Sequence, residues 1–113
     1  MEIKWYHFHI YFEDKDLETL HPILEKLKEV QGLRIGHAHR RPVGPHPVGS
    51  CQVTVPSHLF EPTLQWFMRE RNGLSLFIHP VSGDDYSDHT DHVVWLGKPY
   101  KLNIEFFEKR KSV

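Results

Sequence analysis

The sequence has 113 residues, 39% of them hydrophobic and 26% charged, and this composition predicts one globular domain over residues 1–113 with a frayed tail from about 108 to 113. The formal net charge of −1 argues against a nucleic-acid partner, and no apolar run approaches the ~20 residues that span a bilayer. The chain starts directly in a predicted strand and contains one cysteine, so we expect a cytoplasmic protein without disulfides.

The first predicted elements are a strand and a helix. Residues 3–12 are aromatic and β-branched, which favours a strand with two different faces. The apolar face carries Tyr6, Phe8, Ile10 and Phe12, and the other face carries Trp5, His7, His9 and Tyr11. Apolar residues then recur at helical spacing, which predicts a helix that begins near Thr19 as N-cap and stops at Gly32.

Three more strands and a second helix follow in the sequence. We expect strands at 33–40, 51–55 and 74–79, a helix from about Ser57 to Asn72, and loops at 41–50 and 80–92. In the second strand, alternation places Ile35, His37 and His39 on one face. Residues 92–97 and 100–107 predict a short extension and a final strand.

This β-α-β-β-α-β order predicts an α+β fold of the ferredoxin-like type. Such a fold has a four-stranded antiparallel sheet with both helices on one face, here followed by a C-terminal strand extension. The first strand is then central, with the fourth beside it. His7, His9 and His79 would converge on the face that no helix covers.

The ten histidines of the chain point to a metal site on that face. His7 and His9, ~7 Å apart along one strand, can reach one ion together with His79 from the adjacent strand. Glu13 shares the strand parity of His7 and His9, and it would complete the histidine and carboxylate set typical of non-haem Fe(II). Asp84, Asp85 and Asp88 are the alternative carboxylates.

Two further histidines and three aromatic residues are candidates for the same site. His46 is held between two prolines, as a turn residue or as a ligand or acid–base group. His89 follows Asp88, which could orient its ring, although a solvated loop is the alternative. Trp5, Tyr11 and Phe77 could line a pocket for an aromatic substrate or pack against a second subunit. The remaining histidines are expected at the surface or an interface: His21, His37, His39, His58 and His92.

Four short blocks, in this order, resemble the DOPA 4,5-dioxygenase family of fungi and bacteria. They are Tyr6–Glu13, Pro42–Pro47, Ile78–Asp84, and Asp88–His92 with Trp95–Gly97, and the resemblance covers residues 6 to about 102. It implies a small extradiol-type dioxygenase that opens the ring of DOPA or another catechol with O2. It also implies Fe(II) as cofactor, with zinc as a possible substitute.

The resemblance further implies that His7, His9, His46, His79 and His89 are the functional positions. We expect His7, His9 and His79 as metal ligands, with Glu13 the first carboxylate to test. His46 would be a fourth ligand or an acid–base group, and His89 would support the centre.

Two other interpretations stay open. The first is a small metal-binding or aromatic-ligand-binding protein without turnover. The second is a structural homodimer whose open sheet faces pair through the histidines. A homodimer is compatible with each interpretation.

Overall fold

The computed structural model describes residues 2–111, and the side chains of residues 2–108. Its strands and helices are β1 (Trp5–Phe12), α1 (Leu17–Lys28), β2 (Arg34–His39), β3 (Gly49–Pro56), α2 (Phe60–Glu70), β4 (Ser75–Pro80), α3 (Asp85–Thr90), β5 (Val94–Leu96) and α4 (Glu105–Lys111), with 3-10 helices η1 (Asp14–Asp16) and η2 (Ser57–Leu59). No helix in this described part is long and apolar enough to cross a membrane.

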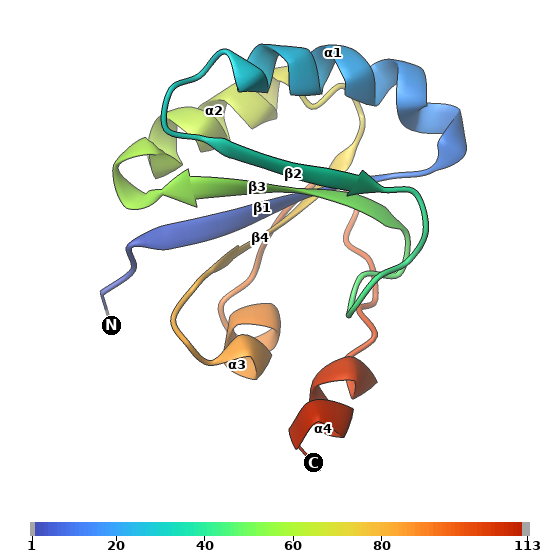
Figure 1. Ribbon diagram of the computed structural model, residues 1–113, viewed down its shortest axis with the longest axis vertical. Helices are drawn as coiled ribbons and strands as arrows, with labels where there is room; N and C mark the ends of the chain where they lie inside the picture. The colour runs from blue at the N-terminus through green and yellow to red at the C-terminus, as the bar shows by residue number, and fades with distance from the viewer. Residues whose placement is uncertain (1, 112–113) are drawn as a thin grey trace.

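The strands form one antiparallel sheet in the order β2-β3-β1-β4-β5. Helices α1 and α2 lie on one face, and α3 and α4 lie on the other (Figure 1). The first four strands and the first two helices confirm the predicted ferredoxin-like arrangement, with β1 central and β4 beside it. Strand β5 is the C-terminal extension of the sheet.

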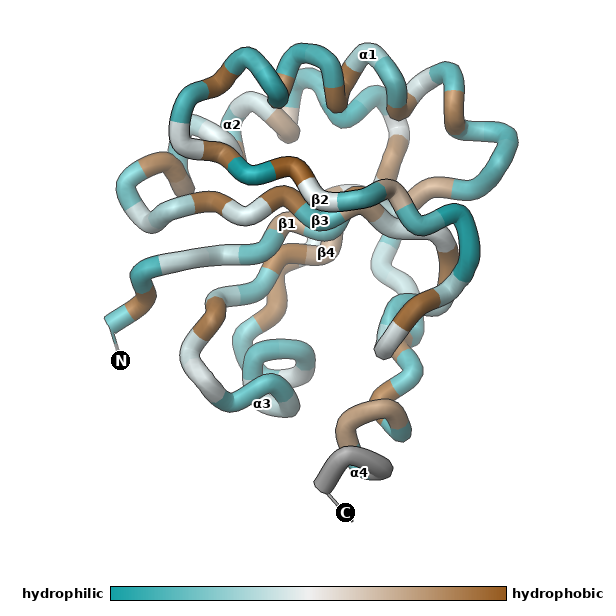
Figure 2. Tube along the Cα trace, in the orientation of Figure 1, coloured by the Kyte–Doolittle hydropathy of each residue, from teal (hydrophilic) through white to brown (hydrophobic). Residues whose placement is uncertain are grey.

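The hydrophobic core fills the space between the sheet and helices α1 and α2. Phe8, Ile10 and Phe12 of β1 are at most 1% exposed there, as alternation in the strand predicts. Apolar residues recur along both helices between hydrophilic ones, which gives each a buried stripe (Figure 2). The buried stripe of α2 does not include Met68, which is 57% exposed.

Helix α1 begins earlier than the sequence predicts. The N-cap expected at Thr19 is wrong, because η1 leads into the helix and Asp16 already accepts a hydrogen bond from the Glu13 backbone N–H at 2.9 Å. Pro22 therefore lies inside the helix rather than in its first turn. It is exposed, and so is Glu18, the residue one turn earlier, so water can reach the backbone carbonyl that Pro22 leaves unpaired.

A β-bulge in β2 overturns the predicted face of His37 and His39. Ile35 pairs with Val53 and Ala38 with Cys51, so two residues of β2 oppose the single residue Gln52. The extra residue shifts the alternation by one position. Ile35 and Ala38 consequently pack on the core, while His37 and His39 face the other side.

The chain after β4 also differs from the prediction. Part of the expected loop 80–92 is helix α3, whose N-cap Asp84 accepts a hydrogen bond from the Ser87 N–H at 3.1 Å. The expected strand at 100–107 is wrong, because Asn103 N–H bonds to the Pro45 carbonyl at 2.8 Å and the chain then turns into α4. Of the tail from 108, residues up to 111 belong to α4, and residues 112 and 113 lie outside the described residues.

Candidate metal centre

Three histidines meet at the centre of the sheet, on the face opposite α1 and α2. His7 of β1 pairs directly with His79 of β4, and His9 lies two residues further along β1 on the same face. Their ligating nitrogens all lie within 4.8 Å of one another, and His9 Nε2 is 3.1 Å from His79 Nε2. Within the described residues, this is the group of His, Cys, Asp or Glu side chains that could hold a metal ion.

In two of the histidines, a hydrogen bond to a backbone carbonyl determines which ring nitrogen carries the hydrogen. His79 Nδ1 lies 2.7 Å from the Pro80 carbonyl oxygen, and His89 Nδ1 lies 2.7 Å from the Asp85 carbonyl oxygen. A carbonyl oxygen only accepts, so Nδ1 carries the hydrogen in both rings. Each neutral ring then has an unprotonated Nε2, which is the form that coordinates a metal or accepts a proton.

Burial keeps these rings uncharged. Loss of hydration, followed by the proximity of the other imidazoles, lowers the pKa of His79 to about 3 and that of His9 well below its ordinary value. The pKa of His7 is also lowered, first by burial and then by His89. Neutral imidazoles at pH 7 are ready ligands, and a short Nε2–Nε2 separation is typical of nitrogens that share one ion. The donor set therefore fits a metal.

His46 stands beside the three, held by a tyrosine. The rings of His46 and His9 are 4.2 Å apart, and His46 Nδ1 lies 2.7 Å from the Tyr11 hydroxyl. Burial raises the pKa of Tyr11, so it stays a phenol, whose O–H is a better donor than its oxygen is an acceptor. With Tyr11 donating to Nδ1, neutral His46 carries its hydrogen on Nε2. Burial and then His89 lower the pKa of His46 to about 4.

Helix α3 brings His89 over the triad. The His89 ring lies 4.0 Å from that of His79 and 4.6 Å from that of Phe107 on α4. Asp88, only 1% exposed, accepts hydrogen bonds from the Ser82 N–H at 2.8 Å and the Ser82 hydroxyl at 2.6 Å. Asp88 thus anchors the segment after β4 to α3 and so positions His89.

The three predicted aromatic residues have different surroundings. Phe77 is fully buried and packs within 6.2 Å of the rings of His9, His46, His79 and His89, as a wall of the centre. Tyr11 is 2% exposed and bonds His46 rather than facing open space. Trp5 is 45% exposed at the start of β1.

The structure does not bring Glu13 to the histidines. Strand β1 ends at Phe12, and Glu13 is the exposed N-cap residue of η1, where its side chain takes part in a capping box with Asp16. Asp84 caps α3 and Asp88 holds Ser82, so two of the alternative carboxylates also have structural partners. The group that could hold a metal is made of histidines alone.

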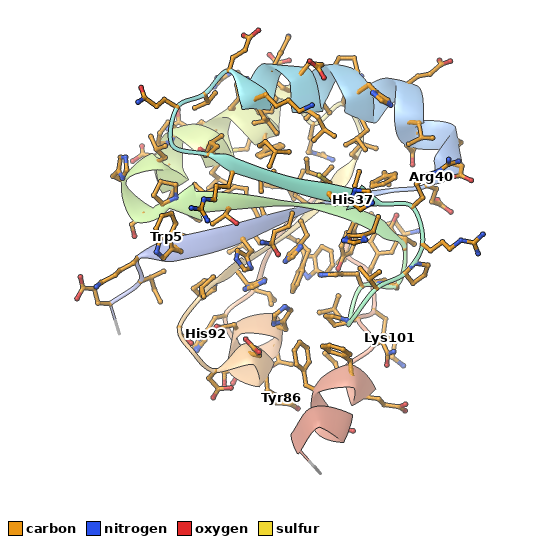
Figure 3. The ribbon with its side chains drawn as sticks, in the orientation of Figure 1. Trp5, His37, Arg40, Tyr86, His92 and Lys101 are labelled. Carbon is orange, nitrogen blue, oxygen red and sulfur yellow. The ribbon has the colours of Figure 1, made fainter. Side chains whose placement is uncertain are left out.

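Sequence reasoning missed part of the aromatic wall. The ring of Trp95 lies 4.8 Å from that of Phe77, and the ring of Tyr100 lies 5.3 Å from that of Tyr11. Together with Phe107 they cover the predicted open face, and side chains fill the space between the sheet and helices α3 and α4 (Figure 3). Trp95 alternates with Val94 and Leu96, and the pairing of β5 with β4 sets it opposite Phe77. This alternation is the sequence signal that could have identified Trp95 as part of the aromatic wall.

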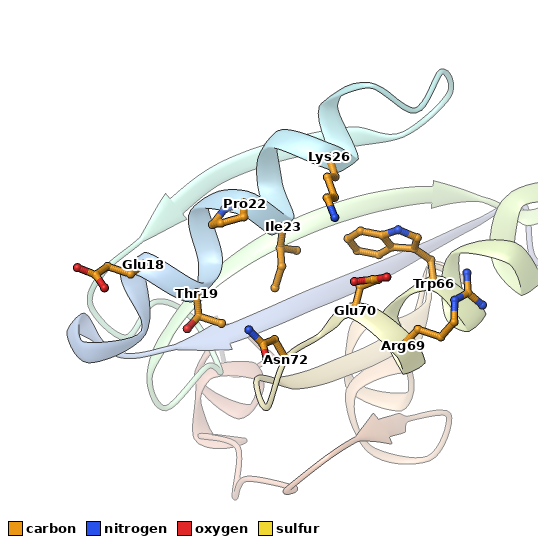
Figure 4. Close-up of a pocket in the computed structure, with 9 residues that line it drawn as sticks. All are labelled: Glu18, Thr19, Pro22, Ile23, Lys26, Trp66, Arg69, Glu70 and Asn72. Atoms are coloured by element: carbon orange, nitrogen blue, oxygen red, sulfur yellow. The ribbon is translucent and has the colours of Figure 1, made fainter.

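Two cavities lie on opposite sides of the sheet. One of about 560 Å³ runs between α1 and α2, lined by charged side chains of both signs such as Lys26 and Glu70 (Figure 4). A smaller one of about 230 Å³ reaches His9 and His46. We place the candidate site at the smaller cavity, because perturbed titratable groups converge there and not between the helices.

A comparison with known protein families identifies the family of the chain. The model of the Dopa 4,5-dioxygenase family matches residues 6–106. The chain belongs to this family. The matched range includes all five clustered histidines, and membership confirms the resemblance that the sequence blocks indicate.

Two individual proteins are similar to most of the chain. It is 33% identical to the DOPA 4,5-dioxygenase of Amanita muscaria in an alignment 112 residues long, which covers 91% of this chain and 49% of that enzyme. It is 28% identical to an uncharacterised 21.2 kDa protein of Botryotinia fuckeliana, covering 92% of this chain and 63% of the other. The chain thus spans about half the length of the Amanita enzyme.

A solved structure has the same fold. The crystal structure of a proposed dioxygenase from Nostoc punctiforme superposes with a TM-score of 0.92 and 34% sequence identity, over 96% of this chain and 94% of that chain.

Proposed function

We propose that this protein is a metal-dependent dioxygenase of the extradiol type, which opens the aromatic ring of DOPA or another catechol with O2. The observation that carries the proposal is the convergence of three neutral imidazoles from His7, His9 and His79 at the centre of the sheet. Family membership supports the reaction class, and the Amanita relative supports DOPA as a first substrate to test.

His7, His9 and His79 would hold the metal, for which we propose Fe(II). Held in this way, Fe(II) would pass electrons from the catechol to O2 and would offer positions at which the two can meet. We propose a histidine-only set without Glu13, because Glu13 caps η1 away from the cluster. The sheet fixes two ligands on the central strand and one on its neighbour, so little ordering is required when the metal binds.

The two supporting histidines suit different roles. His89 has an unprotonated Nε2 and can accept a proton from a catechol hydroxyl, whereas neutral His46 carries a hydrogen on Nε2 and can donate a hydrogen bond to a substrate oxygen. Tyr11 acts through His46 as a positioning residue, and Phe77 provides a rigid wall for the ring. Trp5 would contact substrate only at the rim of the site.

In the overall reaction both atoms of O2 enter the product. The ring carbon–carbon bond next to the diol breaks, leaving one carbon as an aldehyde and its former partner as a carboxylate. The four electrons that reduce O2 come from the catechol, so no other reductant is consumed.

The decisive experiment is reconstitution with Fe(II) under anaerobic conditions, followed by air-saturated buffer and DOPA or simpler catechols. We expect stoichiometric O2 uptake and a yellow ring-opened product with wild type, and neither with His9→Ala. Iron bound stoichiometrically without O2 uptake, for every catechol tried, would overturn the proposal.

The all-histidine ligand set also suits zinc, and this favours a second candidate function. Zinc is commonly held by three histidines, whereas the Fe(II) set often includes a carboxylate. A zinc-binding protein without turnover would retain zinc on purification, resist replacement by Fe(II), and show no catechol chemistry.

A homodimer and a cytoplasmic location stay predictions from the sequence. Light scattering of the purified protein tests the first. Pairing of open sheet faces through the histidines is not supported, because α3, α4 and the ring of Trp95 cover that face.

A further inference from the structure

The cavity beside the metal centre has a buried end and an exposed end. His9 and His46 are 4% and 8% exposed and form its inner end. His37 and His39, both exposed, lie at the outer end, on β2. Figure 3 labels His37 on that strand. A molecule that enters with its aromatic ring toward the metal would therefore leave the rest of its structure beside His37 and His39.

The bulge in β2 is what gives the cavity these two histidines. In a regular strand, His37 and His39 would share the face of Ile35 and point into the core. The shift of one residue turns both to the metal side, where their rings lie edge to face at 4.8 Å. His39 pairs with Ser50, which in turn pairs with Tyr11, so His39 lies in line with the Tyr11–His46 pair.

The polar groups of this cavity favour an anion. None of the described side chains that line it is acidic, and His37, His39, Ser50 and Gln52 each carry an N–H or O–H donor. Acidic groups lie on the other side of the centre, where Asp85 and Asp88 of α3 are close enough to His7 to raise its pKa against the effect of burial. A carboxylate at the outer end of the cavity would meet donors and avoid these charges.

We infer that His37 and His39 form a subsite for a carboxylate on the side chain of the aromatic substrate. The inference rests on the proposed function and specifies it further: the preferred catechols carry a short acidic tail. His37 and His39 are binding residues in this assignment and take no part in the chemistry at the ring.

The test uses two ligands with the same ring, 3,4-dihydroxyphenylacetate and 4-methylcatechol, of which only the first has a carboxylate. Their dissociation constants are measured by calorimetry on the Fe(II)-loaded protein without O2. We expect wild type to bind the acid about tenfold more tightly, the effect of a hydrogen bond to a charged group. The double variant H37A/H39A should lose this preference and bind 4-methylcatechol as wild type does.

Two control variants accompany the double variant. H21A/H58A removes two exposed histidines from α1 and η2 and should leave both dissociation constants unchanged. H37N/H39N keeps an N–H donor at each position and should retain part of the preference. This second variant also serves if H37A/H39A does not fold.

A turnover assay in air separates this inference from the proposed function. Preference in wild type, loss in H37A/H39A and O2 uptake would support both. The same binding results without O2 uptake would support the subsite and overturn the dioxygenase proposal. Equal binding of the two ligands by wild type, or a preference that survives in H37A/H39A, would overturn the subsite whether or not O2 is consumed.

Discussion

The two faces of strand β1 show how one strand can serve both stability and chemistry. Phe8 and Ile10 pack against long amphipathic helices, and that side has the usual composition of a core. His7 and His9 alternate with them and face short segments that come from distant parts of the chain. The helix-covered face therefore stabilises the fold, while the histidine face keeps the imidazoles buried, neutral and close together.

The largest expected effect is the loss of stability caused by a substitution on the core face of β1. Phe8 is fully buried and stacks on Phe67 of α2, so Phe8→Ala leaves a cavity and should reduce the free energy of unfolding by about 3–5 kcal/mol. Urea denaturation measures this. Met68→Ala, at an exposed position on the same helix, should change it by less than about 0.5 kcal/mol. Similar losses for the two variants would contradict the assignment of the core.

A substitution on the histidine face of β1 should leave the fold intact and weaken metal binding. His9→Gln keeps a polar side chain of similar size but loses an imidazole ligand, and we expect metal affinity to fall more than about 100-fold. Competition with a chelator measures the affinity, and circular dichroism checks the fold. His92→Gln, at an exposed position after α3, is the control. Unchanged affinity in His9→Gln would remove His9 from the ligand set.

The Tyr11–His46 contact can be tested separately from the ligands. Tyr11→Phe removes only the hydroxyl that bonds His46 Nδ1, so we expect about tenfold lower kcat and about 1 kcal/mol lower stability, with metal affinity unchanged. Tyr6→Phe, on the helix-covered face of the same strand, is the matched control. A drop in metal affinity in Tyr11→Phe would instead make His46 a ligand.

Acid should lower the free energy of unfolding of the metal-free protein, because the buried histidines bind protons less readily than the unfolded chain does. Burial lowers the pKa of His79 to about 3, against about 6.5 in the unfolded chain, so below pH 6.5 the unfolded chain binds the extra proton. The contribution of His79 is complete above about pH 6.5 and is lost as the pH falls toward 3. Between about pH 6 and 5, the free energy of unfolding of His79→Gln should fall by about 1 kcal/mol less per pH unit than that of wild type. Urea denaturation at the two pH values measures this. His21→Gln should follow wild type.

The sequence predicts the helix-covered face of β1 and the convergence of His7, His9 and His79 for the same physical reason. Alternation with a period of two assigns Phe8 and His9 to opposite faces, and the β-α-β-β-α-β order brings His79 next to His7. Both steps depend on regular elements whose periods are visible in the residues. The resemblance to the family then added His46 and His89, which local spacing leaves undecided.

The sequence does not predict the parts that depend on irregular backbone. The bulge between Ile35 and Ala38 adds a residue that no period reveals, so the face of His37 and His39 is predicted wrongly. Leu102, Ile104 and Phe106 alternate like a strand, yet contacts with the loop around Pro45 turn the chain into α4. Glu13 has the right parity for the site, but the strand ends before it and the residue becomes a helix cap.

The position of the bulge has a consequence for how relatives can diverge. If β2 paired regularly after Ile35, His37 would oppose Cys51, and both imidazoles would move from the mouth of the cavity to the helix-covered face, while β1 and β4 would keep their pairing. The presence or absence of a bulge in this edge strand can therefore change the recognition of a substrate tail without altering the three clustered histidines. Relatives in which the same residues of β2 pair without a bulge should share the three histidines and differ in the acids that they bind.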